Sequence, residues 1–306
     1  MFQIDELSGV LVALASPLKS DGSVDEPAVG RLVEHVLAGG VHGVLALGST
    51  GETAALDEPA RRQVLRAVVS AGAGRVPVIC GVAQSTLASA RAEVRAAAEL
   101  GAAAVLVAPP FYYPMAQPSV LDFYRRVADG ARLPVLVYNI PQFTKVAVEP
   151  ATVAALAKER AIAGIKDSSR DFEYFEGLCV ATRDLPAFRV FTGSDTMLLA
   201  SLVMGGAGTI CGAGNVAPHW VVRIYDEHQA GNLIAAQASQ DRLYRLVAAL
   251  REGVFPLAIK AALHAQGICE PWSAPPVQAL SAEAQAVLRT KLAEWGLVPK
   301  AGAVRS

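Results

Sequence analysis

The chain has 306 residues, of which 53% are hydrophobic, enough for one large α/β domain or two smaller ones. Its 27 basic and 28 acidic residues leave a net charge of −1. Nucleic acids and anionic membranes require a basic face on a protein partner. The composition therefore predicts a protein that has neither a nucleic acid nor a membrane as its main partner.

The first residues and the cysteines indicate the compartment. No stretch reaches the ~18 unbroken apolar residues of a membrane helix. Asp5 and Glu6 stand where a signal peptide would carry positive charge, and the apolar run that follows is typical of a strand. The cysteines lie far apart in apolar stretches without CxxC spacing, so we expect buried thiols and neither a metal site nor disulfides. They are Cys80, Cys179, Cys211 and Cys269. Together these features predict a cytoplasmic protein.

Eight short apolar runs rich in β-branched residues recur about every 30 residues, which fits a βαβ unit. They span residues 9–16, 42–48, 76–82, 103–109, 134–139, 162–168, 188–194 and 208–212. Between them lie stretches with helical periodicity, such as 25–40, 58–72 and 86–101. The predicted strands are apolar nearly throughout, as expected for a parallel sheet that is covered on both faces.

Eight such units predict a closed (β/α)₈ TIM barrel over residues 1–230. A doubly wound open sheet is the alternative, but it usually has fewer strands, and no GxGxxG follows the first strand here. Helical stretches at 232–252, 256–267 and 281–297 predict a C-terminal helical region, residues 231–306, that packs on the barrel.

Polar residues follow the predicted strands at the end where TIM barrels place their active sites. In chain order the segments are GSTGE (48–52), PPFYYP (109–114), YNIP (138–141), KDSS (166–169), TGSD (192–195) and GAGN (212–215). One mouth of the barrel is thus predicted to collect a lysine, tyrosines, hydroxyls, an aspartate and several glycines.

Lys166 is the centre of this predicted site. Of the seven lysines, only Lys166 and Lys260 follow long apolar runs. Burial favours the neutral amine of a lysine, and a neutral amine can attack a ketone to form an imine, which is an electron sink. The alternative is a lysine paired with a barrel carboxylate such as Asp195. Lys260 lies on an expected helix outside the eight repeats, where packing or pairing against the barrel is the favoured interpretation.

Two segments could assist this amine. Tyr138 ends the preceding strand and could relay protons, or it could be a core tyrosine that caps a loop. Ser49 and Thr50 lie in a glycine-flanked turn that could hold a carboxylate, or that could be an ordinary βα turn. Glu52 could orient this loop or be solvated.

The remaining polar candidates are less specific. Tyr112 and Tyr113 could cover the site or pack against another subunit. Gly193 and Asp195 are candidates for substrate binding, where Asp195 could bind substrate hydroxyls or instead serve as the counter-ion of Lys166. The five histidines show no spacing typical of metal ligands, so we assign none of them a role.

With these residues in view, the chain resembles the dihydrodipicolinate synthase / N-acetylneuraminate lyase family of class I aldolases and lyases. The motifs GSTGE, YNIP and GIKDSS (164–169) carry this resemblance, which extends from Ser16-Pro17 through Lys260. It implies that Lys166 forms a Schiff base with pyruvate or another 2-oxo acid and that Tyr138 relays protons. It also implies no metal or organic cofactor, and a homotetramer built as a dimer of dimers.

The same resemblance implies further site residues. Ser49 and Thr50, next to Gly48, would hold the pyruvate carboxylate. Ile210 matches a position whose backbone contacts pyruvate. Tyr112, or Tyr113 in its place, would take part in a relay across a subunit interface.

Departures from the family pattern concern the second substrate. The synthases carry an arginine at the position of Phe143, and they have two threonines where this chain has Ser49-Thr50. Asp195 matches an aspartate of the sialic acid lyases, but Thr196 and Gly212 replace their glutamate and serine. The pattern therefore implies cleavage of a smaller 4-hydroxy-2-oxo acid, of the 2-keto-3-deoxy sugar acid or 4-hydroxy-2-oxoglutarate type.

Other functions stay open at this point. A dehydratase would use the same imine. A synthase of lysine biosynthesis would condense pyruvate with aspartate semialdehyde, and an arginine from elsewhere, such as Arg170, could then substitute for the one missing at Phe143. A catalytically idle barrel could bind a 2-oxo acid as a sensor. A phosphate-binding barrel would use the glycines of residues 205–214, but no basic residue lies in that run.

Overall fold

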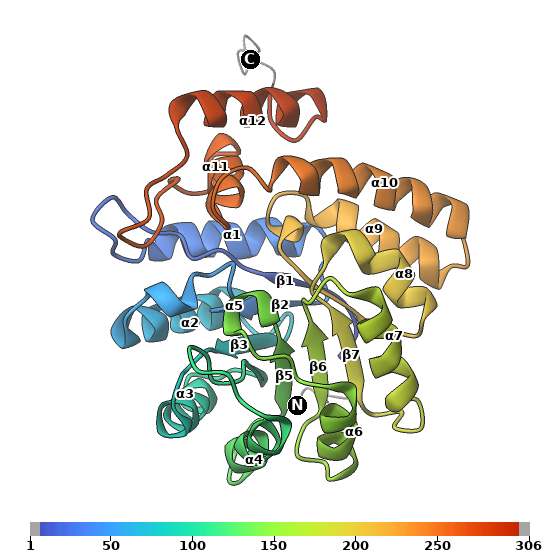
Figure 1. The fold of residues 1–306 in the computed structure, drawn as a ribbon. Coiled ribbons are helices and arrows are strands. Elements are labelled where there is room, and N and C mark those ends of the chain that lie inside the picture. The colour runs from blue at the N-terminus through green and yellow to red at the C-terminus, as the bar shows by residue number, and fades with distance from the viewer. Residues whose placement is uncertain (1–6, 300–306) are drawn as a thin grey trace.

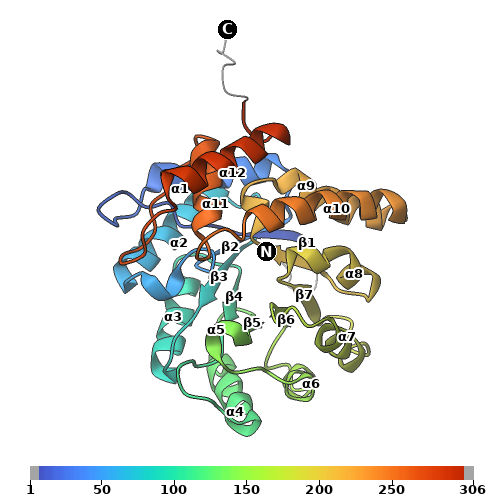
Figure 2. The ribbon, with the colours of Figure 1, turned by 45° about the horizontal axis from the view of Figure 1, so that its top comes forward.

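The computed structural model describes residues 7–299, and its eight strands form one closed parallel barrel in chain order. The strands span Gly9–Ala13 (β1), Gly43–Ala46 (β2), Val78–Val82 (β3), Ala104–Val107 (β4), Val135–Asn139 (β5), Gly164–Asp167 (β6), Arg189–Thr192 (β7) and Gly208–Cys211 (β8). Each strand lies inside one of the predicted runs, so the predicted (β/α)₈ barrel is confirmed (Figures 1 and 2). Asp5 and Glu6 lie outside the described residues, as does the end of the predicted C-terminal region, residues 300–306.

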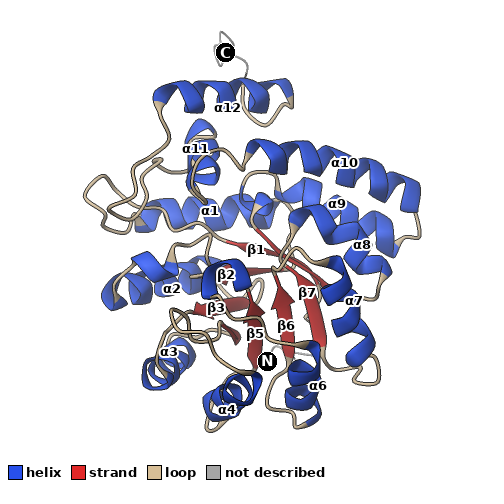
Figure 3. Cartoon of the chain, in the orientation of Figure 1, coloured by secondary structure: helices blue, strands red, loops and turns tan. Residues whose placement is uncertain are grey.

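Helices cover the outside of the barrel (Figure 3). They span Glu26–Ala38 (α1), Glu58–Gly72 (α2), Leu87–Glu99 (α3), Gln117–Ala128 (α4), Pro141–Thr144 (α5), Pro150–Lys158 (α6), Phe172–Ala181 (α7), Leu198–Val203 (α8) and Pro218–Gln229 (α9). Short 3₁₀ helices lie in the loops after β2, β7 and β8, at Thr53–Ala55 (η2), Asp195–Met197 (η3) and Ala213–Asn215 (η4).

Helix α2 shows how the local sequence starts and orients such a helix. The side chain of Asp57 accepts a hydrogen bond of 2.8 Å from the backbone N–H of Ala60, which caps the N-terminus. Pro59 fits the first turn because its missing N–H would have no partner there. Val64 and Val68, four residues apart, are buried on one face, and this face packs toward the barrel.

The barrel has two apolar cores. Alternate residues of a strand point to opposite faces. One set fills the interior of the barrel, and it comprises Leu11, Leu45, Ile79, Leu106, Leu136, Tyr138, Phe191 and Ile210 among others. The other set packs under the helices and includes Val10, Val44, Val105 and Val137. Lys166 pairs in register with Tyr138 on one side and Phe191 on the other, so its side chain faces the barrel interior.

The C-terminal helical region follows the barrel as predicted, with helices at Leu233–Ala249 (α10), Leu257–Ala265 (α11) and Ala282–Glu294 (α12). Helix α10 runs along α9, and α12 lies on α11 at the top of Figure 1. The predicted boundary at residue 230 falls between α9 and α10. Arg31 of α1 donates a hydrogen bond of 2.9 Å to the carbonyl of Ile268, just after α11, so this region is tied to the barrel helices.

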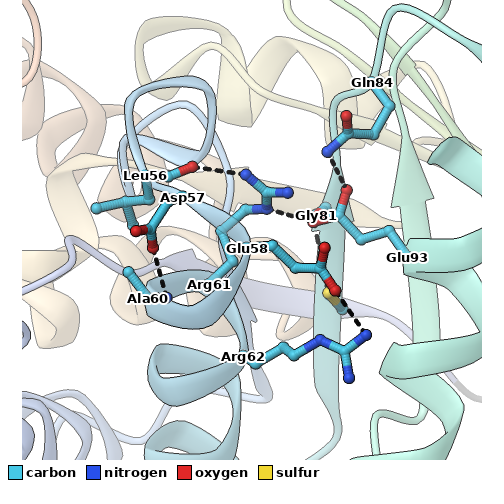
Figure 4. A network of polar contacts seen from close by, with 10 residues as sticks. Leu56, Asp57, Glu58, Ala60, Arg61, Arg62, Gly81, Gln84 and Glu93 are labelled. Atoms are coloured by element: carbon cyan, nitrogen blue, oxygen red, sulfur yellow. Dashed lines mark hydrogen bonds and ion pairs between the residues drawn. The ribbon is translucent and has the colours of Figure 1, made fainter.

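A half-buried polar network joins α2 to α3 on the outside of the barrel (Figure 4). The guanidinium of Arg61 donates to Glu93 at 2.7 Å and to the carbonyl of Leu56 at 2.6 Å. The Gln84 amide donates to the second oxygen of Glu93 at 2.7 Å. Because the side chains of Arg61 and Glu93 are mostly shielded from water, the network fixes α3 against the loop that follows β2.

Two further expectations can be compared with the described residues. The four cysteines are free thiols and all are buried. No helix within residues 7–299 is long and apolar enough to cross a membrane.

Candidate active site

Lys166 and Tyr138 meet at the carboxyl ends of β6 and β5. The two residues are register partners, so their side chains enter the barrel side by side. The ammonium nitrogen Nζ of Lys166 lies 3.5 Å from the phenol oxygen of Tyr138 and 4.5 Å from the centre of its ring. Lys166 is 4% exposed and Tyr138 is 6% exposed. An amine and a phenol are therefore held together at the floor of the barrel mouth.

The turn after β2 brings a second hydroxyl to this pair. The Ser49 hydroxyl lies 3.2 Å from the Tyr138 hydroxyl. Within the turn, the backbone N–H groups of Gly51 and Glu52 bond to the carbonyls of Gly48 and Ser49. Among the described residues, the backbone N–H groups of Ser49 and Thr50 have no hydrogen-bond partner. Unpaired N–H groups beside hydroxyls are what a bound carboxylate requires.

Thr50 and Ile210 lie on the far side of the same mouth. Thr50 is buried, and its hydroxyl oxygen would be 3.7 Å from a Cβ atom placed on Gly212, directly after β8. Ile210 lies on β8 and belongs to the inner core. The ends of β2 and β8 thus approach each other across the predicted carboxylate site.

Gly193 makes room for the side chain of Lys166. A Cβ atom at this position would lie 2.6 Å from Cε of Lys166 and would overlap the hydroxyl of Ser168. Such a contact is too short for any Cβ atom, so only glycine lets the lysine take its observed path. The structure supplies a steric reason for this predicted site residue.

Asp195 lies beside Gly193 but does not pair with Lys166. Its carboxylate accepts a hydrogen bond of 2.9 Å from the backbone N–H of Ala213. Burial raises the pKa of this carboxyl group, an effect that the positive charge of Lys166 partly opposes. Among the described residues, no carboxylate lies within 4.0 Å of Nζ of Lys166. The alternative that Lys166 exists to pair with Asp195 is therefore not supported.

Asn139 and Asp167 hold the two strands in register just behind the reactive pair, and sequence reasoning missed them. The Asn139 amide donates to the Asp167 carboxylate at 2.7 Å, and both side chains are buried. Ser169 donates to the same carboxylate through its backbone N–H at 3.1 Å and its hydroxyl at 2.9 Å. Burial raises the pKa of Asp167, while these hydrogen bonds oppose the rise. A signal for them was present in the sequence, because a polar residue directly follows both Tyr138 and Lys166. Side chains alternate along a strand, so these polar side chains must face the helices and find a hydrogen-bond partner there.

Glu52 and Lys260 form a buried ion pair that ties the turn after β2 to the C-terminal region. The side chain of Lys260 is 0% exposed, and its ammonium contacts the Glu52 carboxylate. It also donates to the carbonyl of Trp272 at 2.6 Å. The other oxygen of Glu52 accepts from the backbone N–H of Ala274 at 2.8 Å. Of the two readings of Glu52, orientation of the loop is the one that the geometry supports, and Lys260 pairs as expected.

A cleft of about 270 Å³ opens above Ser49 and Tyr138. Most of its lining is apolar and comes from several loops and strand ends, including Val82, Ala108, Phe111, Ile140, Phe143 and Phe255. Phe143, which stands where the resemblance places the arginine of the synthases, is 56% exposed and lines this cleft. A smaller pocket of about 80 Å³ is lined by Gly193, Asp195 and Gly212 among others.

Tyr112 and Tyr113 remain at the rim. They are 81% and 75% exposed, and their rings contact each other edge to face at 5.0 Å. The structure of the single chain therefore brings Lys166, Tyr138 and Ser49 together but leaves the two tyrosines outside this cluster. The predicted relay across a subunit interface is not tested by one chain.

The cluster has the geometry of an imine-forming site. An amine, a phenol and a hydroxyl are linked in one row by contacts of 3.5 and 3.2 Å, and Tyr138 and Ser49 of this row line the cleft. A phenol within hydrogen-bond reach of both an amine and a bound substrate can move protons between them. Among the described residues, no group of three or more histidines, cysteines or carboxylates is placed to hold a metal ion.

Comparison with known proteins identifies the family. The model of the dihydrodipicolinate synthetase family matches residues 6–294. The chain belongs to this family. The members are pyruvate-dependent lyases and synthases, so the chain is an enzyme of this class, and the resemblance seen in its motifs is confirmed.

Its relatives include both lyases and synthases. An uncharacterized DapA-like lyase from Halobacterium salinarum is 36% identical over 292 residues, which is 95% of each chain. A monomeric dihydrodipicolinate synthase variant is 30% identical, with a TM-score of 0.92 over 96% of this chain and 99% of its own. YagE, a prophage protein of this family from E. coli K12 whose structure contains pyruvate, is 27% identical, with a TM-score of 0.92 over 95% of this chain and 99% of its own.

Proposed function

We propose that the enzyme is a class I aldolase that cleaves a small 4-hydroxy-2-oxo acid to pyruvate and an aldehyde through a Schiff base on Lys166. The observation that carries this proposal is the row of Lys166, Tyr138 and Ser49 at the barrel mouth. The pyruvate bound to the related YagE supports a 2-oxo acid as ligand. The sequence suggests two substrate types, a 2-keto-3-deoxy sugar acid and 4-hydroxy-2-oxoglutarate, and both have the required C2 ketone and C4 hydroxyl.

Lys166, Ser49 and Thr50 have separate roles in the first steps of the reaction. The amine of Lys166 adds to the C2 ketone, and loss of water gives the iminium. Ser49, Thr50 and their backbone N–H groups hold the carboxylate and thereby orient the imine. As the C3–C4 bond breaks, its electron pair moves toward the iminium nitrogen and leaves an enamine.

Protons then move through Tyr138. The phenol, together with the substrate carboxylate, accepts the proton of the C4 hydroxyl, and the aldehyde leaves. The same proton returns to C3 of the enamine. Water hydrolyses the resulting iminium, which releases pyruvate and restores the amine of Lys166. Every step uses groups of the chain, the substrate and water, so we propose no metal or organic cofactor.

The assembly and the compartment are part of the proposal. The exposed pair of Tyr112 and Tyr113 supports a subunit contact at the rim of the site and a homotetramer built from dimers. The monomeric synthase variant among its structural relatives makes sedimentation velocity a necessary measurement. A cytoplasmic location stays a prediction, in keeping with four free thiols.

The synthase reaction is the second candidate, because a structural relative is a dihydrodipicolinate synthase. It requires a site for the carboxylate of aspartate semialdehyde. Phe143 occupies the position that the resemblance assigns to the arginine for that carboxylate, and its side chain faces the cleft. This favours the aldolase over the synthase.

Borohydride trapping tests the proposal. Reduction in the presence of pyruvate should add the mass of a reduced pyruvate imine to the peptide that contains Lys166, and Lys166→Ala should lose both the adduct and pyruvate release. Lys158→Ala is the matched control because Lys158 is an exposed lysine on α6. An unmodified Lys166 peptide in an active preparation would rule out the mechanism. An adduct without any turnover would indicate a 2-oxo-acid sensor.

A further inference from the structure

We propose that the group on C4 of the substrate is apolar, so that the aldehyde released by the enzyme carries a branched alkyl group or a single aromatic ring. This inference rests on the proposed Schiff-base aldolase, and it replaces the two substrate types suggested by the sequence, which carry polar groups on C4, with an apolar one. Its basis is the apolar lining of the cleft above Tyr138, together with the direction in which the substrate must extend from Lys166.

The direction follows from the chemistry of the cluster. The imine fixes C2 at Lys166, and the unpaired N–H groups of Ser49 and Thr50 fix the carboxylate on the β2 side. The C4 hydroxyl must lie within hydrogen-bond reach of the Tyr138 phenol to lose its proton. Tyr138 lines the larger cleft and not the small pocket beside Gly193. The group on C4 therefore extends into the larger cleft.

The cleft offers this group hydrocarbon contacts from several strands and loops. Val82 comes from β3 and Ala108 follows β4, while Ile140 and Phe143 follow β5. Phe255, from the segment before α11, completes the wall on the C-terminal side. Within residues 7–299, no lysine, arginine or histidine lines this cleft. The environment is that of a binding pocket for an apolar group.

Apart from the Thr53 hydroxyl, which is buried without a hydrogen-bond partner among the described residues, the polar side chains of the lining are already engaged. Ser49 and Tyr138 serve the carboxylate and the C4 hydroxyl in the proposed mechanism. The Glu52 carboxylate is paired with Lys260. The Thr144 hydroxyl bonds to the carbonyls of Ile140 and Val146. A distal carboxylate or a row of hydroxyls would thus lie against Phe143 and its neighbours with the Thr53 hydroxyl as the one unengaged side-chain partner among the described residues, which costs affinity.

The volume sets the size of the group. The cleft holds about 270 Å³, and an apolar cavity of roughly 150 Å³ is known to accept benzene. One aromatic ring, or a branched chain of about four to six carbons, has a volume on the order of that of benzene. Such a group therefore fits in the cleft together with C3 and C4 of the substrate. The chemistry stays balanced, because the substrate R–CHOH–CH₂–CO–COO⁻ gives R–CHO and pyruvate whatever the hydrocarbon R.

The test compares aldehydes in the reverse reaction, the addition of pyruvate. The panel contains benzaldehyde and isobutyraldehyde as apolar members and glyceraldehyde and glyoxylate as polar ones, with product formation followed by chromatography. Because each well-placed methylene in an apolar pocket changes kcat/KM by about 10- to 200-fold, we expect at least a ~10-fold preference for the apolar members. Borohydride trapping with pyruvate alone is run on the same preparation.

A matched pair of variants assigns any preference to the cleft. Phe143→Arg should lower kcat/KM for benzaldehyde by at least ~10-fold and raise it for glyoxylate, since it adds a cation to an apolar wall. Ile234→Arg makes the same kind of change at an 89% exposed position of α10 and should leave both values unchanged.

The outcomes separate this inference from the proposed function. An adduct on Lys166 with equal or better use of glyceraldehyde or glyoxylate would overturn the apolar substrate and leave the aldolase intact. If a second copy of the chain fills the cleft in the assembled enzyme, apolar aldehydes would likewise show no preference, and the inference would be overturned. Failure to trap pyruvate on Lys166 would overturn both. A preference for apolar aldehydes that Phe143→Arg reverses would establish the inference.

Discussion

Replacement of Lys260 by methionine isolates the buried ion pair that supports the active-site turn. Met has a similar length and no charge, so Lys260→Met removes the ammonium and keeps most of the packing. The Glu52 carboxylate, whose side chain is 7% exposed, then loses its ionic partner and keeps only its bond to the Ala274 N–H. The carbonyl of Trp272 also loses its donor.

The expected cost follows from these losses. Removing one partner of a buried ion pair costs about 3–5 kcal/mol, because the other charge stays buried without compensation. Burial lowers the pKa of Lys260 and the Glu52 charge opposes this, which agrees with a pair held away from water. We therefore expect Lys260→Met to lower the free energy of unfolding by about 3 kcal/mol or more. We also expect the KM for pyruvate to rise, since the turn that carries Ser49 and Thr50 loses its anchor.

Urea unfolding followed by circular dichroism measures the stability, and pyruvate addition measures the KM. The double variant Glu52→Gln/Lys260→Met is the decisive control, because it removes the unpaired charge while an amide replaces the carboxylate. It should be more stable than Lys260→Met alone. A loss below about 1 kcal/mol in Lys260→Met, the range of an exposed pair, or a double variant less stable than the single one, would refute this reasoning.

Three other changes have expected outcomes. Gly193→Ala should abolish the borohydride adduct in a folded protein, because its Cβ would collide with Cε of Lys166; an adduct at the normal rate would contradict this. Tyr138→Phe should lower kcat about 10²- to 10⁴-fold for loss of proton transfer while an adduct still forms; wild-type turnover would remove Tyr138 from the mechanism. Burial lowers the pKa of His35, so the unfolded chain binds more protons as pH falls below about 6.5 and stability is lost there. His35→Gln should flatten this fall in urea titrations at pH 5 to 7, and an unchanged slope would assign it to other groups.

The barrel and the reactive pair could be predicted because both follow from local patterns. Eight apolar runs at regular spacing determine the barrel, and residues that end neighbouring parallel strands must meet at one mouth. Tyr138 and Lys166 end two such strands, and their register confirms the contact. Asn139 and Asp167 follow from the same alternation, but their partnership depends on register, which no pattern in one strand reveals.

The apolar cleft could not be predicted, because its walls come from segments far apart in the chain. Phe143 could be recognised as a departure from the synthase pattern. One phenylalanine alone does not make the cleft apolar, however, because an arginine from another segment could still enter it. The structure shows that Val82, Ala108 and Phe255 surround the same space, and that no basic side chain of the described part of the chain lines it. The packing of the helices determines which loops lie over the barrel mouth, and the order of residues in the chain does not reveal it.

Lys166 and Lys260 show why a buried lysine alone does not identify a nucleophile. Both follow apolar runs and both are buried, at 4% and 0% exposure. Lys260 contacts a carboxylate, which favours its charged form and opposes attack on a ketone. Lys166 faces a phenol and, among the described residues, has no carboxylate within 4.0 Å. The fold gives each amine a different partner. The register of β5 and β6 places Tyr138 beside Lys166, and helix α11, packed over the turn after β2, places Lys260 beside Glu52. This difference in partner distinguishes the proposed nucleophile from the structural ion pair.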